Sequence, residues 1–188
     1  MYSMSAPTIQ SEAPADFDAV DVLLRLAFGQ PDEAVLVRRL RECDAYRANL
    51  TLVARVDGRV VGLIMLTRAW VVPDDSTATS REVGVTHDAI PVLALAPMAV
   101  LPEYQRRGIG GSLVHHALDA ARRAGERLVI VLGHPEYYPR FGFRPASAWG
   151  VRCPFDVPDE AYMLLNLATL PLPRLDGVMR YARPFQHH

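Results

Sequence analysis

Gln105-Arg106-Arg107-Gly108-Ile109-Gly110-Gly111 joins an apolar run that ends at Val100 to a strongly helical segment. Its glycines allow a tight turn, and the N–H groups that open the following helix carry partial positive charge. A phosphate group is stabilised at such a helix N-terminus, and the two adjacent arginines strengthen that preference. A glycine turn that only connects a strand to a helix has the same local pattern, so this stretch alone leaves both interpretations open.

A second pattern, Tyr137-Tyr138-Pro139-Arg140-Phe141-Gly142-Phe143, follows the next predicted strand. The two stretches, with a helix and a strand between them, together resemble the GCN5-related N-acetyltransferase (GNAT) family. Gln105, Gly108 and Gly110 match its acyl-CoA signature, Gln/Arg-x-x-Gly-x-Gly/Ala. Tyr138, Gly142 and Phe143 match its later Tyr-x-x-x-Gly-Phe pattern. This second phrase and the C-terminal segment from Gly177 to Tyr181 resemble a subgroup of bacterial predicted N-acetyltransferases.

The resemblance implies an α/β fold of the α+β type that covers residues 1–188 as a single domain. In this family a mixed, mostly antiparallel central sheet of about six to seven strands has splayed central strands and is flanked by about four helices. Composition agrees independently, because 188 residues, half of them hydrophobic, suffice for one domain with a real core. No domain boundary is visible in the sequence.

The hydrophobic pattern predicts where the elements lie. The expected strands are Ile9 to Glu12, Leu50 to Val56, Val60 to Val71, Val92 to Val100, Leu128 to Leu132, Ala161 to Leu167 and Gly177 to Tyr181. The expected helices run from Asp16 to Phe28, from Glu33 to Arg41 and from Ser112 to Ala124. Asp16 is expected to cap the first helix, and Asp57-Gly58 to close a hairpin. The polar stretch from Pro73 to Asp88 is expected to be a long exposed excursion.

Pro97 interrupts the predicted central strand, Val92 to Val100, whose residues are otherwise apolar. Proline removes one hydrogen bond from a sheet, so it fits a bulge or an unpaired edge. In the family that this chain resembles, the corresponding strand carries a bulge and splays from its neighbour, which opens a slot for the pantetheine arm of the cofactor. An irregular edge strand is the other explanation.

The resemblance implies acetyl-CoA as cosubstrate. Main-chain amides of the central strand, at Met98, Ala99 and Val100, would then bind the developing oxyanion. The pyrophosphate would lie on the loop that Gln105 opens, bound by the amides of Arg106, Arg107, Gly108, Ile109, Gly110, Gly111 and Ser112. The two arginine side chains could meet a phosphate or could be solvated surface charges, and for Arg107 the second explanation is nearly as good as the first.

Tyr138 occupies the position at which the resembled family places a tyrosine close to the cofactor sulfur, as general acid or hydrogen-bond donor. A tyrosine that only packs its ring and bonds its hydroxyl is the structural alternative, and Tyr137 could instead be the packing residue. No general base is evident, because the central strand lacks the glutamate that many family members use. His134 could be a base, a substrate contact or a turn residue, and Glu136 is open to the same alternatives.

Charge and cysteine content limit the other classes of function. A formal net charge of −1 gives no general attraction to nucleic acid or to an anionic membrane. Cys43 and Cys153 are too few for a disulfide framework, and no cluster of Cys and His has metal-ligand spacing, so no metal is expected. A reducing cytoplasm is the natural compartment. No apolar segment has membrane-spanning length, and the apolar C-terminal strands could support a homodimer.

The leading hypothesis is an acetyl-CoA-dependent N-acetyltransferase in which an acceptor amine attacks the thioester directly. The acceptor could be a small molecule or a peptide amine. Acidic residues could attract it, although a solvated acidic loop is the commoner explanation for them; they are Asp32, Glu33, Asp74, Asp75 and Glu82. A non-catalytic acyl-CoA-binding regulatory module is the competing hypothesis, supported by the missing base. A nucleotide-binding Rossmann-like protein fits less well, because the Asp57-Gly58 hairpin indicates antiparallel strands at the start.

Overall fold

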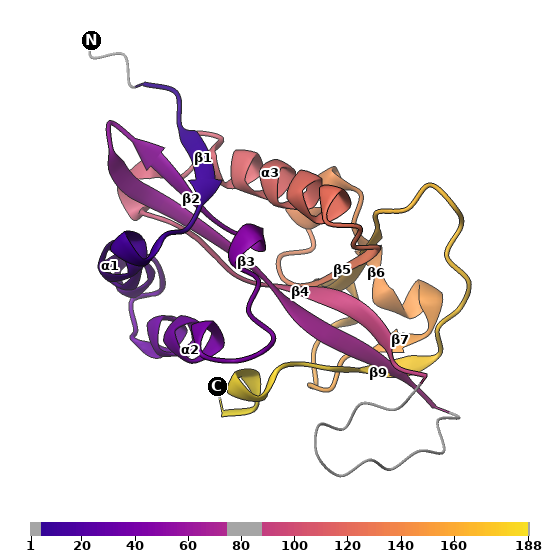
Figure 1. The fold of residues 1–188 in the computed structure, drawn as a ribbon. Coiled ribbons are helices and arrows are strands. Elements are labelled where there is room, and N and C mark those ends of the chain that lie inside the picture. Colours follow the sequence, from indigo (N-terminus) through magenta and orange to yellow (C-terminus); the bar gives the residue numbers. More distant parts are fainter. Residues whose placement is uncertain (1–4, 75–87, 188) are drawn as a thin grey trace.

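The computed structural model describes residues 5–74 and 88–187, and its strands form one mixed sheet (Figure 1). The described strands lie in the order β1-β2-β3-β4-β5-β8-β6, while β9 pairs with β3 and β7 pairs with β9. The strands are β1 (Thr8–Ser11), β2 (Thr51–Val56), β3 (Arg59–Pro73), β4 (Ile90–Val100), β5 (Leu128–Leu132), β6 (Arg144–Pro145), β7 (Val151–Arg152), β8 (Tyr162–Asn166) and β9 (Gly177–Arg180). The α-helices are α1 (Phe17–Phe28), α2 (Asp32–Arg41) and α3 (Ile109–Arg123).

The sheet is mixed and mostly antiparallel, as the family resemblance implies. Among the described strands, the parallel pairs are β4 with β5 and β7 with β9. The described part of the chain contains nine strands and three α-helices, where about six to seven strands and about four helices were expected. The strands that sequence analysis missed, β6 and β7, have two residues each, which is too short for a hydrophobic pattern. Between β5 and β8 the chain forms 3-10 turns.

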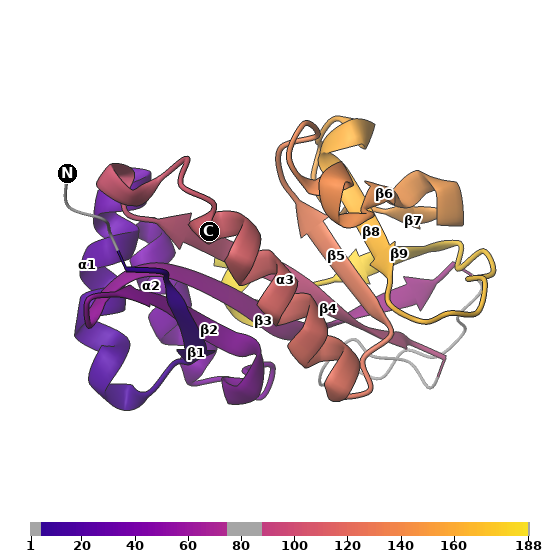
Figure 2. The same ribbon diagram turned by 90° about the horizontal axis from the view of Figure 1, so that it is seen from above.

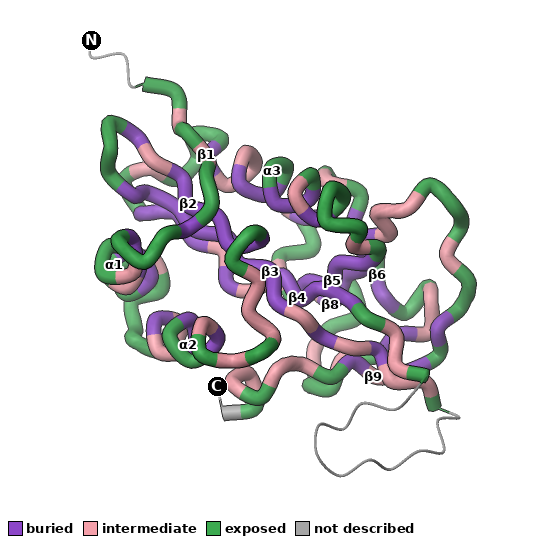
Figure 3. The backbone as a smooth tube through the Cα atoms, viewed as in Figure 1, coloured by how far each residue is buried: buried purple, intermediate pink, exposed green. Residues whose placement is uncertain are grey.

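A tight hairpin starts the sheet, and the helices cover its two faces. Asp57 and Gly58 have φ angles of 49° and 82°, and two successive positive values are what a type I′ turn between β2 and β3 needs. Helices α1 and α2 lie on one face and α3 on the other (Figures 1 and 2). Buried residues follow the central strands and the inward sides of these helices, so the core lies in two layers around the sheet (Figure 3).

Asp16 precedes α1 as expected, but it does not cap the helix in the expected way. Its own backbone is already helical, with φ −90° and ψ −16°. The carboxylate instead accepts a hydrogen bond from the Ala13 N–H, at 3.0 Å, and pairs with Arg55 on β2. Asp16 therefore closes the 3-10 turn before α1 and ties it to the sheet. The other end of α1 agrees with expectation, because Gly29 ends it in the left-handed conformation.

Strand β4 leaves its neighbour β5 soon after the two strands meet. The parallel register joins Leu93 to Val129 and Ala94 to Ile130. On its other side β4 pairs with β3 as far as Val100, with a register shift opposite the Ala96-Pro97 pair, whose peptide bond is cis. Pro97 thus lies at an irregularity of the ladder, as the bulge hypothesis predicts. Beyond Ala94, the edge of β4 that faces β5 has no strand partner among the described residues.

A buried ion pair fixes α2 against the first strand. The Arg41 guanidinium at the end of α2 binds the Glu12 carboxylate, with Nη2 to Oε1 at 2.5 Å, and the Glu12 side chain is fully buried. The Tyr46 hydroxyl also donates to Glu12, at 3.3 Å, and the guanidinium lies 3.9 Å from the centre of the Phe17 ring. Removing one partner of such a pair typically costs about 3–5 kcal/mol. The position of α2 beside the sheet is therefore strongly determined.

The C-terminal strands β8 and β9 pair with other strands of the same sheet. Residues 162–165 of β8 are buried between β5 and β6, and Met179 of β9 is fully buried. The apolar side chains that suggested a homodimer are thus largely covered within one chain. Most of the expected excursion from Pro73 to Asp88, including Asp75 and Glu82, lies outside the described residues. None of the described helices has the length and apolar character that crossing a membrane would require.

Candidate active site

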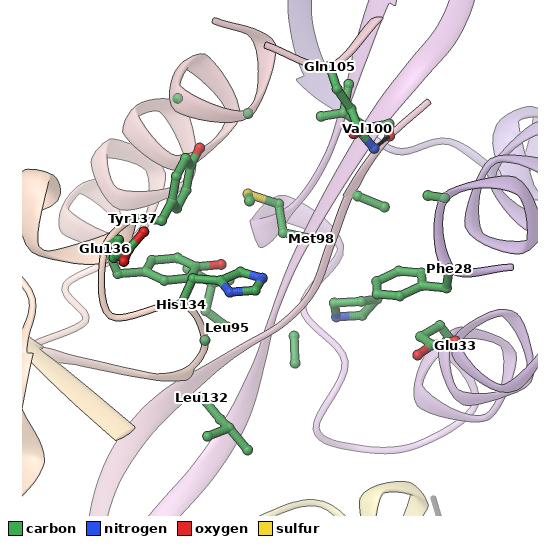
Figure 4. Close-up of a pocket in the computed structure, with 18 of the residues that line it drawn as sticks. Phe28, Glu33, Leu95, Met98, Val100, Gln105, Leu132, His134, Glu136 and Tyr137 are labelled. Atoms are coloured by element: carbon green, nitrogen blue, oxygen red, sulfur yellow. Dashed lines mark hydrogen bonds between the residues drawn. The ribbon is translucent and has the colours of Figure 1, made fainter. Parts of the chain in front are cut away.

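A cavity of about 1420 Å³ opens where β4 and β5 diverge (Figure 4). Its walls come from the second half of β4, the loop before α3 with the first turn of that helix, the residues 133–140 after β5, the end of α1, part of α2 and the C-terminal residues. The predicted site residues that line it are Met98, Ala99, Val100, Gln105, Arg106, Gly108, Gly110, Gly111 and Tyr138. The other predicted residues, Arg107, Ile109 and Ser112, do not line it.

Strand β4 directs only part of the predicted set of amides into this cavity. The Leu101 N–H donates to the Val61 carbonyl on β3 at 2.9 Å, whereas the Val100 carbonyl accepts the Gln105 side-chain amide at 3.0 Å. Backbone groups of successive strand residues point to opposite sides. Val100 and, by the same alternation, Met98 therefore face the cavity side. The Ala99 amide faces β3, which corrects the expectation that all three amides are available.

The loop before α3 provides the expected cradle of free amides. Gly108 has a φ of 82° and Arg106 a φ of 57°, so the chain reverses sharply before the helix begins at Ile109. The first N–H to bond within the helix is that of Ser112, which donates to the Gly108 carbonyl at 3.0 Å. The amides of residues 108–111 are the ones left free by the helix geometry. Ser112 was expected to contribute its amide too, but the helix already uses it.

Two arginines reach the cavity near this cradle, and one of them was missed by sequence analysis. Arg106 lines the cavity, as does Arg140, whose guanidinium stacks 4.6 Å from the centre of the Tyr137 ring. The Arg140 Nε also donates to the Tyr137 carbonyl at 2.9 Å, which fixes the direction of the side chain. Arg107 instead lies 5.7 Å from the centre of the Tyr104 ring. Arg140 belongs to the motif from Tyr137 to Phe143, but only the folded chain shows that it lines the cavity.

Tyr138 lies just after β5, and its ring packs against Gly133 at the buried side of the cavity. Its side chain is 6% exposed, lines the cavity and contacts Phe143 edge to face, with ring centres 5.6 Å apart. Burial raises the pKa of the Tyr138 hydroxyl well above its usual value, and Tyr137 adds a smaller effect of the same sign. The neighbouring Tyr137 is half-buried, and its hydroxyl lies against Gly110 in the first turn of α3. Both tyrosines therefore face the cavity, Tyr137 at the cradle and Tyr138 deeper along β5.

His134 and Glu33 enter the cavity from opposite walls (Figure 4). His134 follows β5, and its carbonyl accepts the N–H groups of Tyr137, at 3.0 Å, and Tyr138, at 3.4 Å. Glu33 lies in the first turn of α2, where the Gln30 side-chain amide holds its carboxylate at 3.2 and 3.3 Å. Glu136 also lines the cavity. The sequence named these residues without distinguishing them from other polar residues, because nothing in it shows that α2 faces the loop after β5.

Other polar residues singled out in the sequence lie elsewhere. Asp74 pairs with Arg152, and Asp32 does not line the cavity. Within residues 5–74 and 88–187, no group of three or more His, Cys, Asp and Glu side chains could hold a metal ion. The site thus has free amides and arginines at one end and the unpaired edge of β4 in the middle. The neutral phenol of Tyr138 lies beside that edge, and His134 and Glu33 lie beyond it. Such a site suits an elongated ligand that carries phosphate at one end and reacts in the middle.

Comparison with known proteins supports this interpretation. Residues 17–143 match the model of the acetyltransferase (GNAT) family. The chain is 38% identical over 162 residues to YjhQ of Escherichia coli strain K12, described as an uncharacterized N-acetyltransferase, and this match covers 84% of the chain and 82% of that relative. It is 32% identical over 178 residues to YhbS of the same organism, also described as an uncharacterized N-acetyltransferase, covering 94% of the chain and 97% of YhbS.

Solved structures agree in fold over nearly the whole chain. The crystal structure of E. coli YhbS in complex with CoA matches with a TM-score of 0.82 and 30% identity, covering 99% of this chain and 96% of that one. A GNAT family acetyltransferase from Brucella melitensis in complex with acetyl-CoA matches with a TM-score of 0.71 and 26% identity, covering 96% and 98% of the two chains. The overall fold is thus shared with two proteins whose solved structures contain CoA or acetyl-CoA.

Replacing Gly133 by alanine tests the packing beneath Tyr138. An added Cβ would lie 2.9 Å from Tyr138 Cδ2 and closer still to Cε2, so the ring would have to move. We expect the free energy of unfolding, measured by urea denaturation, to fall by about 1–3 kcal/mol. Gly111→Ala is the matched control, because a Cβ there meets nothing within 4 Å. Since alanine favours a helix over glycine, this variant should raise the free energy of unfolding by up to about 1 kcal/mol. Equal stability of the two variants would contradict this placement of the ring.

Proposed function

This chain belongs to the GNAT family of acetyltransferases, and we propose that it transfers the acetyl group of acetyl-CoA directly to an acceptor amine. The observation that carries the proposal is the cavity between β4 and β5, which runs from the free amides of α3 past Tyr138 to the far side of the sheet. One continuous sheet from β1 to β6 supports a single domain over residues 1–188. The two unpaired cysteines are consistent with our further proposal of a cytoplasmic location.

The residues present fit acetyl-CoA as cosubstrate. The amides of residues 108–111, with Arg106 and Arg140 beside them, suit the pyrophosphate, because free N–H groups at a helix start bind anions. The backbone groups of Met98 and Val100 suit the pantetheine arm, since an unpaired strand edge offers donors and acceptors to an extended chain. A Cβ at Gly110 would lie 2.9 Å from the Tyr137 hydroxyl, so a side chain there would require Tyr137 to move.

The reaction needs a neutral amine, a stabilised oxyanion and a stabilised leaving group. The acceptor nitrogen attacks the thioester carbonyl, a C–N bond forms, and the C–S bond then breaks with the electron pair leaving on sulfur. An N–H of Met98 or Val100 on the free edge of β4 would bind the oxyanion. The proton lost from nitrogen balances the one that the CoA thiol finally carries, so the overall reaction consumes no other reactant.

The pKa of Tyr138 decides between the two roles open to it. A thiol has a pKa of about 8.5, well below that of a phenol, and burial raises the pKa of Tyr138 further above that of the leaving group. Complete proton transfer from Tyr138 to the thiolate is therefore uphill. We assign Tyr138 the role of a hydrogen-bond donor that stabilises negative charge on sulfur, while solvent supplies the final proton.

The cavity favours an enzyme over the alternative of a non-catalytic acyl-CoA-binding module. That alternative rested on the missing base, and a blocked acceptor channel would favour it. His134 and Glu33 both reach the cavity, and the cavity continues past β4 toward α2 and the C-terminal residues. A polar group able to accept a proton and an open route for an acceptor are what an enzyme requires.

Paired arginine variants test the cofactor end of the site. Arg106→Ala should weaken CoA binding by about tenfold or more, because a charge-assisted hydrogen bond to phosphate is lost. Arg107→Ala should change it by less than about threefold, because Arg107, although exposed like Arg106, does not line the cavity. Isothermal titration calorimetry with CoA measures both. Equal losses would contradict the assigned cradle, and no CoA binding by the native protein would contradict the proposed function.

Tyr138→Phe tests the leaving-group role. We expect kcat for release of CoA thiol from acetyl-CoA, measured with a panel of primary amines, to fall about ten- to a hundredfold. Tyr137→Phe should lower kcat by a smaller factor, because the Tyr137 hydroxyl lies at the cradle. Since burial raises the pKa of Tyr138, the hydroxyl keeps its proton as pH rises, and kcat of the native enzyme should not decline between pH 8 and about 9.5. Native-like kcat for Tyr138→Phe would exclude the assigned role.

A further inference from the structure

The half of the cavity that lies away from α3 is walled by aromatic side chains from separate parts of the chain. Phe28 ends α1, Phe155 follows β7, and Tyr181 and Phe185 follow β9. The Phe155 and Tyr181 rings lie 5.6 Å apart between centres, and Tyr181 and Phe185 lie 5.2 Å apart. These three rings form a continuous surface, called here the aromatic wall. Burial raises the pKa of Tyr181, so the aromatic wall stays uncharged through the neutral range.

Apolar exposure is concentrated at this cavity. The large hydrophobic residues that the described structure leaves exposed are Val22, Leu26, Phe28, Leu132, Phe155 and Leu170. Half of them, Phe28, Leu132 and Phe155, line this one cavity, with 41%, 43% and 45% exposure. Exposed aromatic surface gathered in a concave site favours a ligand with an apolar body, which would cover it.

Glu33 adds a charge to this apolar half of the cavity. Glu33 as a residue is partly buried, and its carboxylate faces the cavity and accepts exposed hydrogen bonds from the Gln30 side chain (Figure 4). Within the described residues Glu33 has no salt-bridge partner, whereas the arginines that line the cavity, Arg106 and Arg140, belong to the cradle side. A carboxylate that has no cation beside it attracts an ammonium group and can form a charge-assisted hydrogen bond with it. The cavity is thus arranged for an anionic ligand at one end and a cationic one at the other.

We propose that the acceptor is a small primary amine with an aromatic or bulky apolar body, whose ammonium group is bound by Glu33 and whose body contacts the aromatic wall. This inference rests on the proposed acetyl transfer and names its substrate class. The bound ammonium loses one proton to solvent, the neutral nitrogen forms the C–N bond as the C–S bond breaks, and a second nitrogen proton is balanced by the one taken up by the CoA thiol. Glu33 is here a binding residue, which acts before the bond-forming step.

The first test compares acceptors on the native protein. Phenethylamine carries both proposed features, glycinamide carries an amine without an apolar body, and putrescine carries charge without an aromatic ring. With acetyl-CoA held constant, kcat/KM should be at least about tenfold higher for phenethylamine than for either of the others. Equal or higher values for glycinamide or putrescine would overturn the inference while leaving acetyl transfer intact. A peptide with N-terminal phenylalanine preferred over phenethylamine would also overturn it, in favour of a peptide acceptor.

The second test uses neighbouring carboxylates on α2. Glu33→Gln should raise KM for phenethylamine about tenfold or more with a smaller change in kcat, because the charge that holds the ammonium is lost. Asp32→Asn is the matched control and should leave KM within about twofold, since Asp32 is exposed and does not line the cavity. Phe155→Ala should reduce the preference for phenethylamine over glycinamide. Equal KM values for the Glu33 and Asp32 variants would refute the assignment.

Calorimetry separates failure of this inference from failure of the proposed function. If no amine is acetylated, the CoA complex is titrated with phenethylamine, and binding that Glu33→Gln weakens would still support the acceptor site. Absence of phenethylamine binding to a protein that binds CoA would overturn the inference alone. Absence of CoA binding would overturn the proposed function itself.

Discussion

The early end of the ladder between β4 and β5 is the constraint on which the site depends. The two strands share register positions only at Leu93 and Ala94 on the β4 side, within the described sheet. Pro97 lacks an N–H, and the register against β3 shifts beside it, which bends β4 away. Had the ladder continued, β5 would have used the backbone groups of Met98 and Val100, and a ligand could not reach them. An interruption of regular structure thus provides the binding edge.

The chain uses this opening by placing opposite charges at its two ends. The first turn of α3 brings free amides and arginines to one end, and α2 brings Glu33 to the other. The buried pair of Glu12 and Arg41 holds α2 against β1, so the carboxylate is presented from a fixed element. Tyr138 lies between the two ends, beside the free edge of β4. A reaction between an anionic donor and a cationic acceptor is favoured by such an arrangement, because each partner is attracted to its own end.

Sequence patterns predicted the local features well and the long-range ones poorly. The Asp57-Gly58 turn, the bulge at Pro97 and the glycine cradle follow from backbone conformations that few residue types allow, so single residues reveal them. The bond that uses the Ser112 amide depends on where the helix starts, and helix boundaries are the least certain part of such predictions. Phe155 belongs to the cavity only because β7 and β9 bring distant segments together, and no local pattern carries that information.

The central claim is that the gap between β4 and β5 binds acetyl-CoA with its sulfur beside Tyr138. A crystal structure of the protein with CoA tests it most directly. The account predicts pyrophosphate on the amides of residues 108–111, pantetheine hydrogen-bonded to Met98 and Val100, and sulfur within hydrogen-bonding distance of the Tyr138 hydroxyl. CoA bound elsewhere, or a pantetheine arm that makes no hydrogen bond to β4, would contradict it.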